Sequence, residues 1–288
     1  MVRAGHDFVR RPPVDAVRTD GRLTMEASRL QPHAFVVPAY GRSPHLEQCL
    51  RSLADQTRHS SIVVATSSPF EGMRALVEAH GGTLHVHDRG GSIGRDWNAA
   101  LAAANAQWVT LAHQDDVYLP TFVQSTLEAV RRHPNASLVF TGYREMSGNG
   151  RRPVSLMLRI KRVLLELGFL GRGAIYGKAA KRRALAFGCP VPCPSVTLPG
   201  ATPFRFREDL KVNLDWDAWM RIAQQEGAFV YVRQALMLHR LHEGSETESG
   251  IRDGVRAAED RMMFGRVWPA PIASVLARLY SLSYSNGT

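Results

Sequence analysis

The sequence contains no apolar run long enough to cross a bilayer, and its amino-terminal residues lack the apolar core of a signal peptide. It has only three cysteines, Cys49, Cys189 and Cys193, an odd number that cannot form a complete disulfide framework. Cys189 and Cys193 do not have the spacing of a zinc knuckle, and no paired histidines lie near them. We therefore expect reduced thiols and a cytoplasmic protein.

Acidic residues are in the minority, with 26 Asp and Glu against 36 Lys and Arg, so the net charge is +10. This charge favours an anionic partner, which can be nucleic acid, an anionic lipid leaflet or a phosphorylated substrate. It is concentrated in Arg3–Arg29 and Arg151–Arg183. The sequence has no motif that reads bases and no platform of interleaved aromatic and basic residues, so we expect no nucleic acid partner.

Most of the chain has the pattern of one α/β domain. Residues 1–32 contain few large apolar residues and are expected to form a disordered segment. Beyond them, short apolar runs alternate with helical patterns, which predicts βαβ units and a largely parallel sheet. The expected strands are residues 34–37, 61–66, 83–87, 109–112 and 136–141. The expected helices are one that begins at Ser43-Pro44 and those over residues 71–79, 96–105 and 120–133.

One strand ends in acidic residues. The apolar run from Val109 to Ala112 is followed at once by His113-Gln114-Asp115-Asp116. Ligands of open α/β sheets bind at the carboxyl ends of the strands, where this segment is expected to lie. Two adjacent carboxylates repel, and a divalent cation bridging to phosphate oxygens relieves that repulsion. The alternative is an ordinary strand end at which Asp116 begins or caps the next helix.

Five segments, in order along residues 34–250, resemble those of family 2 glycosyltransferases of the GT-A fold. They are Val36-Val-Pro38-Ala39-Tyr40-Gly-Arg42, Asp96-Trp-Asn98-Ala-Ala-Leu, His113-Gln114-Asp115-Asp116, Leu214-Asp215-Trp216-Asp217-Ala-Trp-Met-Arg221 and Leu238-His-Arg-Leu-His242-Glu-Gly-Ser245-Glu-Thr247. The resemblance implies a Rossmann-like mixed sheet flanked by helices over residues 33–250. Residues 33–145 would be the nucleotide-binding half, residues 146–250 the acceptor-binding half, and residues 251–288 a C-terminal helical extension.

The resemblance implies a metal site. Asp115 takes the last position of the family's DxD motif and is the expected ligand, whereas His113 replaces the first aspartate and is a further candidate. His242 is implied to be another ligand or a diphosphate contact, and the alternative is a histidine in a surface loop. The expected ion is Mn²⁺ or Mg²⁺, and an imidazole ligand slightly favours Mn²⁺.

A nucleotide-diphosphate sugar is the implied donor. The residues implied to contact it are Pro38, Ala39, Tyr40, Arg42, Thr66, Asp96, Asn98, Gln114 and Asp115. The family carries an aspartate after its second strand that this sequence lacks. Either a hydroxyl of Thr66 or Ser67 takes its place, or the donor differs from that of the family. For Asp96 and Asn98 the alternative role is to cap a helix.

The resemblance places the general base at Asp215, although carboxylates at the start of a helix also stabilise its dipole. Asp217 points to a different side of that helix, so we expect it mainly to stabilise the helix start and secondarily to contact the acceptor. Trp216, next to the base, is expected to contact the acceptor, and the alternative for it is packing in the core.

The region from Val154 to Leu170 is apolar but carries basic residues such as Lys161. A basic amphipathic helix can lie on an anionic membrane surface, which suits a glycan or lipid-linked acceptor. The alternative is a helix that packs on the sheet with a solvated basic side. Residues 251–288 are expected to form one helix before Trp268-Pro269 and another from Ile272 to Tyr280, for packing or a homodimer contact.

The resemblance implies a metal-dependent inverting glycosyltransferase that acts by a single displacement with no covalent intermediate. It would move a sugar to a hydroxyl of a saccharide or lipid-linked acceptor in cell-surface glycan synthesis, peripheral to the inner face of the membrane. The alternative is a non-catalytic nucleotide-sugar-binding protein of the same fold, suggested by His113 and by the missing carboxylate.

Overall fold

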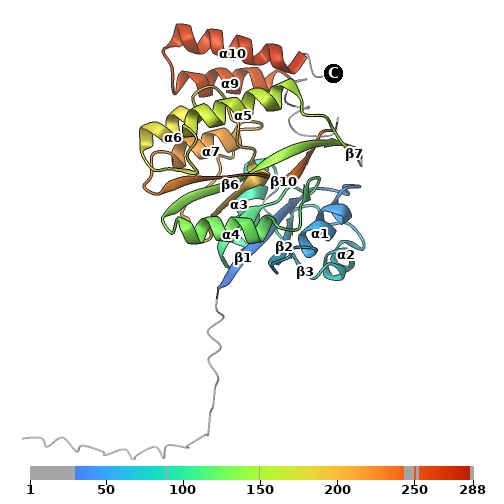
Figure 1. Cartoon of the computed structure of the whole chain (residues 1–288). Coiled ribbons are helices and arrows are strands. Elements are labelled where there is room, and N and C mark those ends of the chain that lie inside the picture. The colour runs from blue at the N-terminus through green and yellow to red at the C-terminus, as the bar shows by residue number, and fades with distance from the viewer. Residues whose placement is uncertain (1–29, 89, 149, 243–249, 251–252, 286–288) are drawn as a thin grey trace, which may run out of the picture.

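The computed structural model describes residues 30–88, 90–148, 150–242, 250 and 253–285. Within these residues ten strands form one mixed sheet, which has helices on both faces (Figure 1). The strand order is β3-β2-β1-β4-β9-β6-β10-β5, with β7 beside β6 and β8 beside β10. This is the α/β architecture with a mixed sheet that the sequence predicts.

The first part of the sheet is parallel and is built from βα units. Its elements are β1 (Gln31–Ala39), α1 (Leu46–Ala54), β2 (Ser61–Thr66), α2 (Met73–Ala79), β3 (Gly82–Val86), α3 (Ile93–Ala102) and β4 (Ala106–Leu111). Strand β1 is central here, since Val36 pairs in parallel register with Val63 on one side and with Leu111 on the other. The carboxyl ends of β1, β2 and β4 therefore lie along one edge, as expected for a ligand site.

The second part mixes strand directions. Its elements are β5 (Val117–Tyr118), α4 (Phe122–Arg132), β6 (Ala136–Ser147), β7 (Gly150–Arg151), α5 (Leu156–Phe169), β8 (Ala174–Ile175), α6 (Lys178–Ala184), a 3₁₀ turn (Cys193–Ser195), β9 (Val196–Pro199), α7 (Leu214–Ile222), β10 (Ala228–Arg240), α9 (Val255–Gly265) and α10 (Ala270–Ser285). Strand β9 runs antiparallel between β4 and β6, and so joins the parallel part to the parallel pair of β6 and β10.

Helix α1 shows how the apolar pattern fixes packing. Leu46, Cys49, Leu50 and Leu53 form the predicted stripe, and all four are buried against the sheet. The predicted start of the helix is wrong, however. The helix begins at Leu46, and the hydroxyl of Ser43 accepts a hydrogen bond from the N–H of His45 instead of capping the first turn.

Other element boundaries also differ from the prediction, and two of them concern the site. Helix α3 begins at Ile93, where the Ser92 side chain accepts the N–H of Arg95, so Asp96 lies inside the first turn and does not cap it. Strand β6 continues to Ser147, well beyond the predicted end at residue 141, because β10 pairs with it along most of its length.

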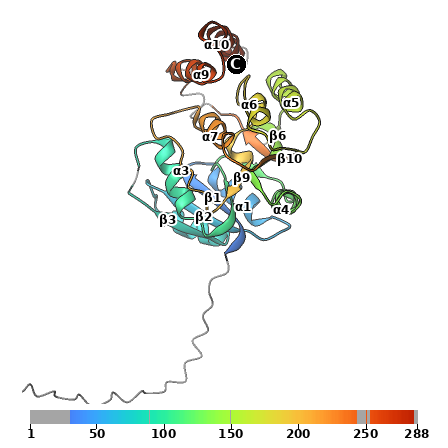
Figure 2. The same cartoon turned by 90° about the vertical axis from the view of Figure 1, so that its left-hand side faces the viewer.

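The ends of the chain differ in how they can be described. Residues 1–29, most of the segment expected to be disordered, lie outside the described residues, and β1 already begins at Gln31. The two helices expected in residues 251–288 are present as α9 and α10, which pack side by side at one end of the molecule, beyond α7 (Figure 2). No helix among the described residues is long and apolar enough to span a bilayer.

Candidate active site

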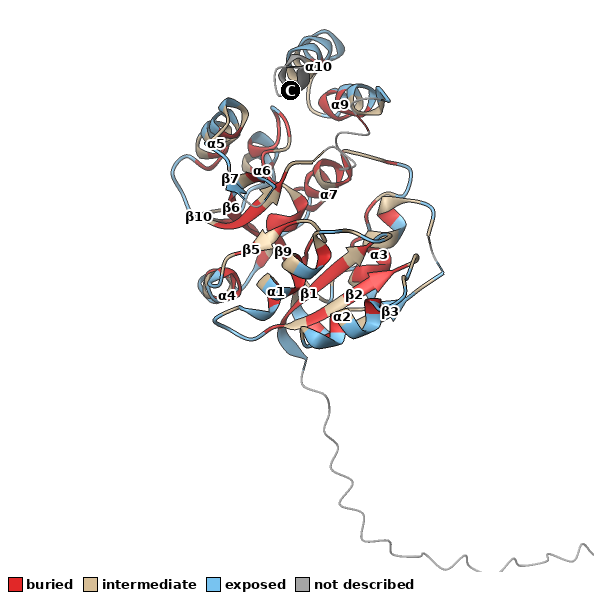
Figure 3. Ribbon diagram, turned by 90° about the vertical axis from the view of Figure 1, so that its right-hand side faces the viewer, coloured by how far each residue is buried: buried red, intermediate tan, exposed pale blue. Residues whose placement is uncertain are grey.

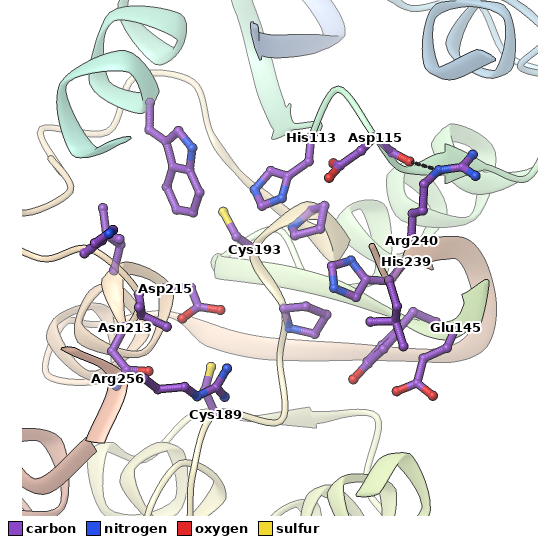
Figure 4. Close-up of a pocket in the computed structure, with 18 of the residues that line it drawn as sticks. His113, Asp115, Glu145, Cys189, Cys193, Asn213, Asp215, His239, Arg240 and Arg256 are labelled. Atoms are coloured by element: carbon purple, nitrogen blue, oxygen red, sulfur yellow. Dashed lines mark hydrogen bonds between the residues drawn. The ribbon is translucent and has the colours of Figure 1, made fainter. Parts of the chain in front are cut away.

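A cleft of about 330 Å³ opens at the carboxyl ends of β1 and β4 (Figure 4). One wall carries Pro38 and the segment from His113 to Asp115, and the opposite wall carries Asp215 at the start of α7. The proline-rich loop around Cys189 and Cys193 and the C-terminal helices complete the lining. The cleft therefore gathers residues from most of the chain at the edge that the sequence predicts.

The two adjacent carboxylates after β4 have different environments. Asp116 is completely buried, accepts the backbone N–H of Arg240 at 2.9 Å and lies 3.1 Å from Nδ1 of His239. It thereby holds the end of β10 beside the end of β4. Asp115 lines the cleft instead, so the repulsion between the neighbours is relieved by giving each carboxylate its own partners.

His113, Asp115 and Asp116 can bring one ligand atom each to within 4.8 Å of one another. The Nε2 atom of His113 is buried and has no hydrogen-bond partner among the described residues. Burial lowers the pKa of His113, which keeps the imidazole neutral and its lone pair free for coordination. An unpaired buried nitrogen next to a carboxylate fits a divalent cation that accepts mixed nitrogen and oxygen ligands.

His242 lies beside this group, with its Nε2 atom 2.7 Å from Oδ2 of Asp115. Its hydrogen bond to the carboxylate raises the pKa of His242. Burial acts to raise the pKa of Asp115, but the hydrogen bond from His242 outweighs it, and the pKa falls to about 2. Asp115 is therefore ionised, and His242 can serve the site as a ligand or as a donor to phosphate.

The turn after β1 is fixed to the end of β4 by Gln114. Its side chain accepts the N–H of Tyr40 at 3.2 Å and donates to the carbonyl of Tyr40 at 3.3 Å. Tyr40 is 70% exposed, and the Arg42 guanidinium lies over the Phe70 ring. Ala39 is buried in β1, so it supports this turn and does not present a side chain to the cleft.

Asp96 of α3 lies beside the end of β2. This is where the family carries the aspartate that the sequence lacks after its second strand. Ser67 donates a hydrogen bond to Asp96 at 3.1 Å, and Nε2 of His87 lies 3.8 Å from the same oxygen. Neither ring nitrogen of His87 has a hydrogen-bond partner in the described part of the chain. The expectation for Thr66 is corrected, because its side chain is buried and its hydroxyl accepts the N–H of Ser68.

Asn98 is also placed differently from the expectation. Its amide donates to the carbonyl of Phe206 at 2.9 Å and accepts the N–H of Phe206 at 2.8 Å, so both of its polar atoms are already paired. Nearby, a Cβ on Gly94 would lie 2.2 Å from the carbonyl oxygen of Arg207, so the loop approaches α3 too closely for any larger residue. Both of these bonds go to the loop backbone, so the structure assigns Asn98 the role of positioning this loop.

Asp215 faces the acidic strand end across the cleft (Figure 4). Burial raises the pKa of Asp215, while the N–H of Trp216 and the positive charges of Lys161 and Arg256 act in the opposite direction. A carboxylate with a raised pKa, set in a cleft, has the properties required of a general base.

The helix that carries Asp215 is held by the C-terminal extension. Glu259 of α9 accepts the backbone N–H groups of Lys211, Val212 and Asn213, at 2.7, 3.0 and 2.7 Å. The Asn213 side chain donates to Asp260 at 2.7 Å. These bonds satisfy backbone donors just before α7 that no helical turn can satisfy. The extension thus fixes the position of Asp215, a role that the sequence does not indicate.

Two expected acceptor contacts are wrong. Trp216 has no exposed surface, and its indole N–H donates to the carbonyl of Leu185 at 3.1 Å, so it belongs to the core. Asp217 is fully buried and pairs with Arg221 at 2.7 Å and with Arg266. Asp215 and Asp217 point to different sides of α7, and only the side of Asp215 faces the cleft.

The sequence predicts no individual role for several residues of the cleft lining. They are Tyr143, Glu145, Lys161, Cys189, Cys193, Lys211, Arg256 and Tyr280, together with His239 and Arg240, which lie inside the motif that ends the family resemblance. Some had a partial signal, since Lys161 stands out as a charge within an apolar helix. Arg256 and Tyr280 had none, because residues 251–288 follow the last recognisable motif and were assigned only packing or a dimer contact.

The model of the family described as glycosyl transferase family 2 matches residues 34–196. Solved structures also resemble the chain. S. aureus TarS 1–349 shares 15% identity, with a TM-score of 0.59 over 89% of this chain and 74% of that chain. The mannosyltransferase PcManGT from Pyrobaculum calidifontis, in complex with GDP-Man and Mn²⁺, shares 15% identity, with a TM-score of 0.57 over 90% and 76%.

A third structure is glucosyl-3-phosphoglycerate synthase from Mycobacterium tuberculosis, in complex with Mn²⁺, UDP and phosphoglyceric acid. It shares 16% identity, with a TM-score of 0.51 over 81% of this chain and 78% of that chain. No curated protein sequence matches the chain. At these identities the structural likeness shows the fold, which is the predicted GT-A fold.

Proposed function

The chain belongs to glycosyl transferase family 2, and we propose that it is a metal-dependent, inverting member that transfers a sugar from a nucleoside diphosphate to a hydroxyl group. One observation carries the proposal. An ionised carboxylate with an unpaired imidazole, Asp115 and His113, faces a second carboxylate with a raised pKa, Asp215, across one cleft.

The donor side of the cleft would hold the diphosphate. His113 and Asp115 would bind a Mn²⁺ or Mg²⁺ ion, with His242 as a further ligand or as a donor to a phosphate oxygen. Such an ion supplies positive charge to the leaving diphosphate. Asp116 keeps these residues in place through the end of β10, and Gln114 sets the turn that carries Tyr40.

The nucleoside would lie over the ends of β1 and β2. Pro38 lines the cleft, and the exposed ring of Tyr40 offers a flat surface for a base to stack on. Arg42, whose guanidinium lies over the Phe70 ring, would supply a positive charge to a phosphate from this turn. Asp96, held by Ser67 at the end of β2, supplies the carboxylate for hydrogen bonds to the base or ribose. The unpaired nitrogens of His87 make further polar contacts available there.

Transfer would be a single displacement. The acceptor oxygen attacks the anomeric carbon as the bond from that carbon to the diphosphate oxygen breaks, and the bonding electron pair leaves with the diphosphate. Asp215 takes the proton of the acceptor hydroxyl in the same step. Because attack and departure occur on opposite faces, the product has the inverted anomeric configuration, which NMR of the product measures directly.

A thermal-shift panel tests the proposal. Nucleoside diphosphates and their sugars are added to the full chain, each with and without Mn²⁺ or Mg²⁺. A ligand that binds only the folded state stabilises it by mass action, by about 2.7 kcal/mol at a concentration one hundred times its Kd. This gain in stability raises the melting temperature. We expect metal-dependent stabilisation by one nucleotide class.

Asp115→Ala should remove that metal-dependent stabilisation. The matched control is Asp55→Ala, which removes an exposed carboxylate at the end of α1, outside the cleft lining. If no nucleotide stabilises the protein with either metal, or if Asp115→Ala responds like the control, the proposed donor site is wrong.

A further inference from the structure

A second hollow lies next to the reaction cleft, between α5 and α10. It is an apolar groove of about 220 Å³, and its walls include Met157, Ile160 and Leu164 from α5 with Leu276 and Leu279 from α10. The side chain of Phe264 and the loop around Gly188 also line it. Nothing in the proposed transfer of a sugar requires an apolar groove at this position.

The groove and the cleft share part of their lining. Lys161, Cys189 and Tyr280 line both. The Tyr280 ring lies close over Gly188, which has φ of +128°, and a Cβ there would come within 2.9 Å of the ring. Glycine is therefore required where the ring crosses the loop. The shared residues make the groove continuous with the side of the cleft that holds Asp215.

A cation lies at the junction between the two hollows, because Lys161 lines both of them. Lys161 and Arg256 both line the cleft, and both are close enough to Asp215 to favour its ionised form. Lys161 is presented by a helix whose neighbouring residues line the groove. An anionic group at the junction would therefore have a cation beside it and apolar walls immediately beyond it. This combination fits an amphiphile with a phosphate next to a hydrocarbon chain.

The outer surface around the groove has the same character. Leu156, Ile160, Val163 and Leu167 form an exposed stripe along α5, and Ile272, Val275 and Leu279 form another on α10. Figure 3 shows both helices with exposed faces at the same end of the molecule. The exposed side chains of Arg152, Arg159 and Arg172 lie on and around α5. A surface with apolar stripes and a basic rim complements a lipid with an anionic head group.

We propose that this groove binds the hydrocarbon chain of a lipid-linked acceptor. The phosphate of the lipid lies at Lys161, and the acceptor hydroxyl, on the far side of that phosphate from the hydrocarbon chain, faces Asp215. This inference rests on the proposed function, because it identifies the acceptor of the same reaction. The inference distinguishes between two kinds of acceptor. A lipid-linked acceptor would fill the groove, whereas a soluble saccharide would leave it without a ligand.

The test uses n-hexyl, n-octyl and n-decyl phosphate as probes, each below its critical micelle concentration, titrated into the full chain by isothermal calorimetry. Burial of one methylene group is worth about fourfold in affinity, so each step of two methylenes should tighten binding by roughly fifteenfold. Inorganic phosphate should bind much more weakly than the longest probe. The matching alcohols, which lack the phosphate, should also bind more weakly, and Lys161→Gln should remove that difference.

The double variant Ile160→Glu/Leu279→Glu places charge on both walls of the groove at partly exposed positions, where the fold tolerates it. It should abolish the dependence on chain length. Its matched control is Val163→Glu/Val275→Glu, which changes exposed apolar residues of the same helices (57% and 59% exposed, against 43% and 59% for Ile160 and Leu279) that do not line the groove. The control should bind the probes like the wild type.

Three outcomes would overturn the inference: affinity independent of chain length, equal loss in both double variants, or loss only in the control. Equal loss, accompanied by loss of binding to vesicles of phosphatidylcholine and phosphatidylglycerol, would indicate contact with a membrane surface and no acceptor groove. The metal-dependent nucleotide shift is measured on the same variants. A variant that no longer binds the probes but keeps the metal-dependent nucleotide shift has an intact donor site. A failure of this inference can therefore be distinguished from a failure of the proposed function.

Discussion

Two aspartates of α7 lie two residues apart and should respond in opposite ways to the same substitution. Asp217 is fully buried and accepts a hydrogen bond from Nε of Arg221 at 2.7 Å and another from Arg266, with Arg207 at 3.9 Å. Asp215 is in the cleft wall. We expect Asp217→Asn to lower stability and Asp215→Asn to lower turnover.

The magnitude for Asp217 follows from its surroundings. Removing one partner of a buried ion pair costs about 3–5 kcal/mol when the remaining charge is fully buried. The three arginine side chains keep 32–39% of their surface exposed, so water can replace part of what they lose. We therefore expect a loss of about 2–3 kcal/mol. For a domain of this size that corresponds to a fall in melting temperature of roughly 4–12 °C.

Asp215→Asn should not have this effect. Burial raises the folded-state pKa of Asp215 above its unfolded value, so the ionised group opposes folding at neutral pH. A neutral amide removes that cost, and the melting temperature should stay constant or rise. Loss of a general base should reduce turnover by roughly 10²–10⁴-fold. Turnover is measured as release of nucleoside diphosphate from the donor that the thermal-shift panel selects.

Asp209→Asn is the control for both substitutions, because this carboxylate is exposed and pairs only at the surface with Arg207. It should change neither the melting temperature nor turnover. The reasoning would be refuted if Asp217→Asn left the melting temperature unchanged, or if Asp215→Asn kept full turnover. A large fall in melting temperature for Asp215→Asn would show that this carboxylate is structural.

Three further predictions concern pH, a loop and the core. Because burial raises the pKa of Asp215, kcat/KM should fall as the pH drops through a value above the ordinary aspartate pKa of about 3.9. A pH profile in which kcat/KM falls only near about 3.9 would contradict the role of Asp215 as the base. Asn98→Ala leaves both backbone groups of Phe206 unpaired, so urea unfolding should show a loss of about 2 kcal/mol; an unchanged midpoint would contradict the positioning role. Trp216→Phe removes the hydrogen bond to the carbonyl of Leu185 and should lower the melting temperature by a few degrees without altering the KM for the acceptor. A raised KM would indicate that Trp216 contacts the acceptor after all.

Local pattern determined much of the fold. The alternation of short apolar runs with helical stripes predicted the β1–β4 units in their correct order, because the periods of side chains on strands and helices differ and are visible in short windows. It also predicted that His113 and Asp115 follow a buried strand. Helix starts were less accurate, as at α1 and α3, because a cap depends on hydrogen bonds that the residue types alone do not fix.

The tertiary structure decided which hydrogen-bond partner a polar residue takes when several are available. The partner of Asn98 is a backbone segment 108 residues away, so nothing near Asn98 in the sequence indicates that its amide is already paired. The same holds for the C-terminal extension. Glu259 and Tyr280 follow no motif, and only packing of α9 and α10 beside α7 brings them to the base and to the groove.

The two adjacent carboxylates after β4 show the contribution of the local sequence and that of the tertiary structure. The sequence by itself determined that Asp115 and Asp116 stand together at the end of a strand, because the apolar run before them is local. Only the tertiary structure decided which of them faces the cleft. Strand β10 brings the N–H of Arg240 and the ring of His239 to Asp116, so that carboxylate is used inside the protein and Asp115 is left for a ligand.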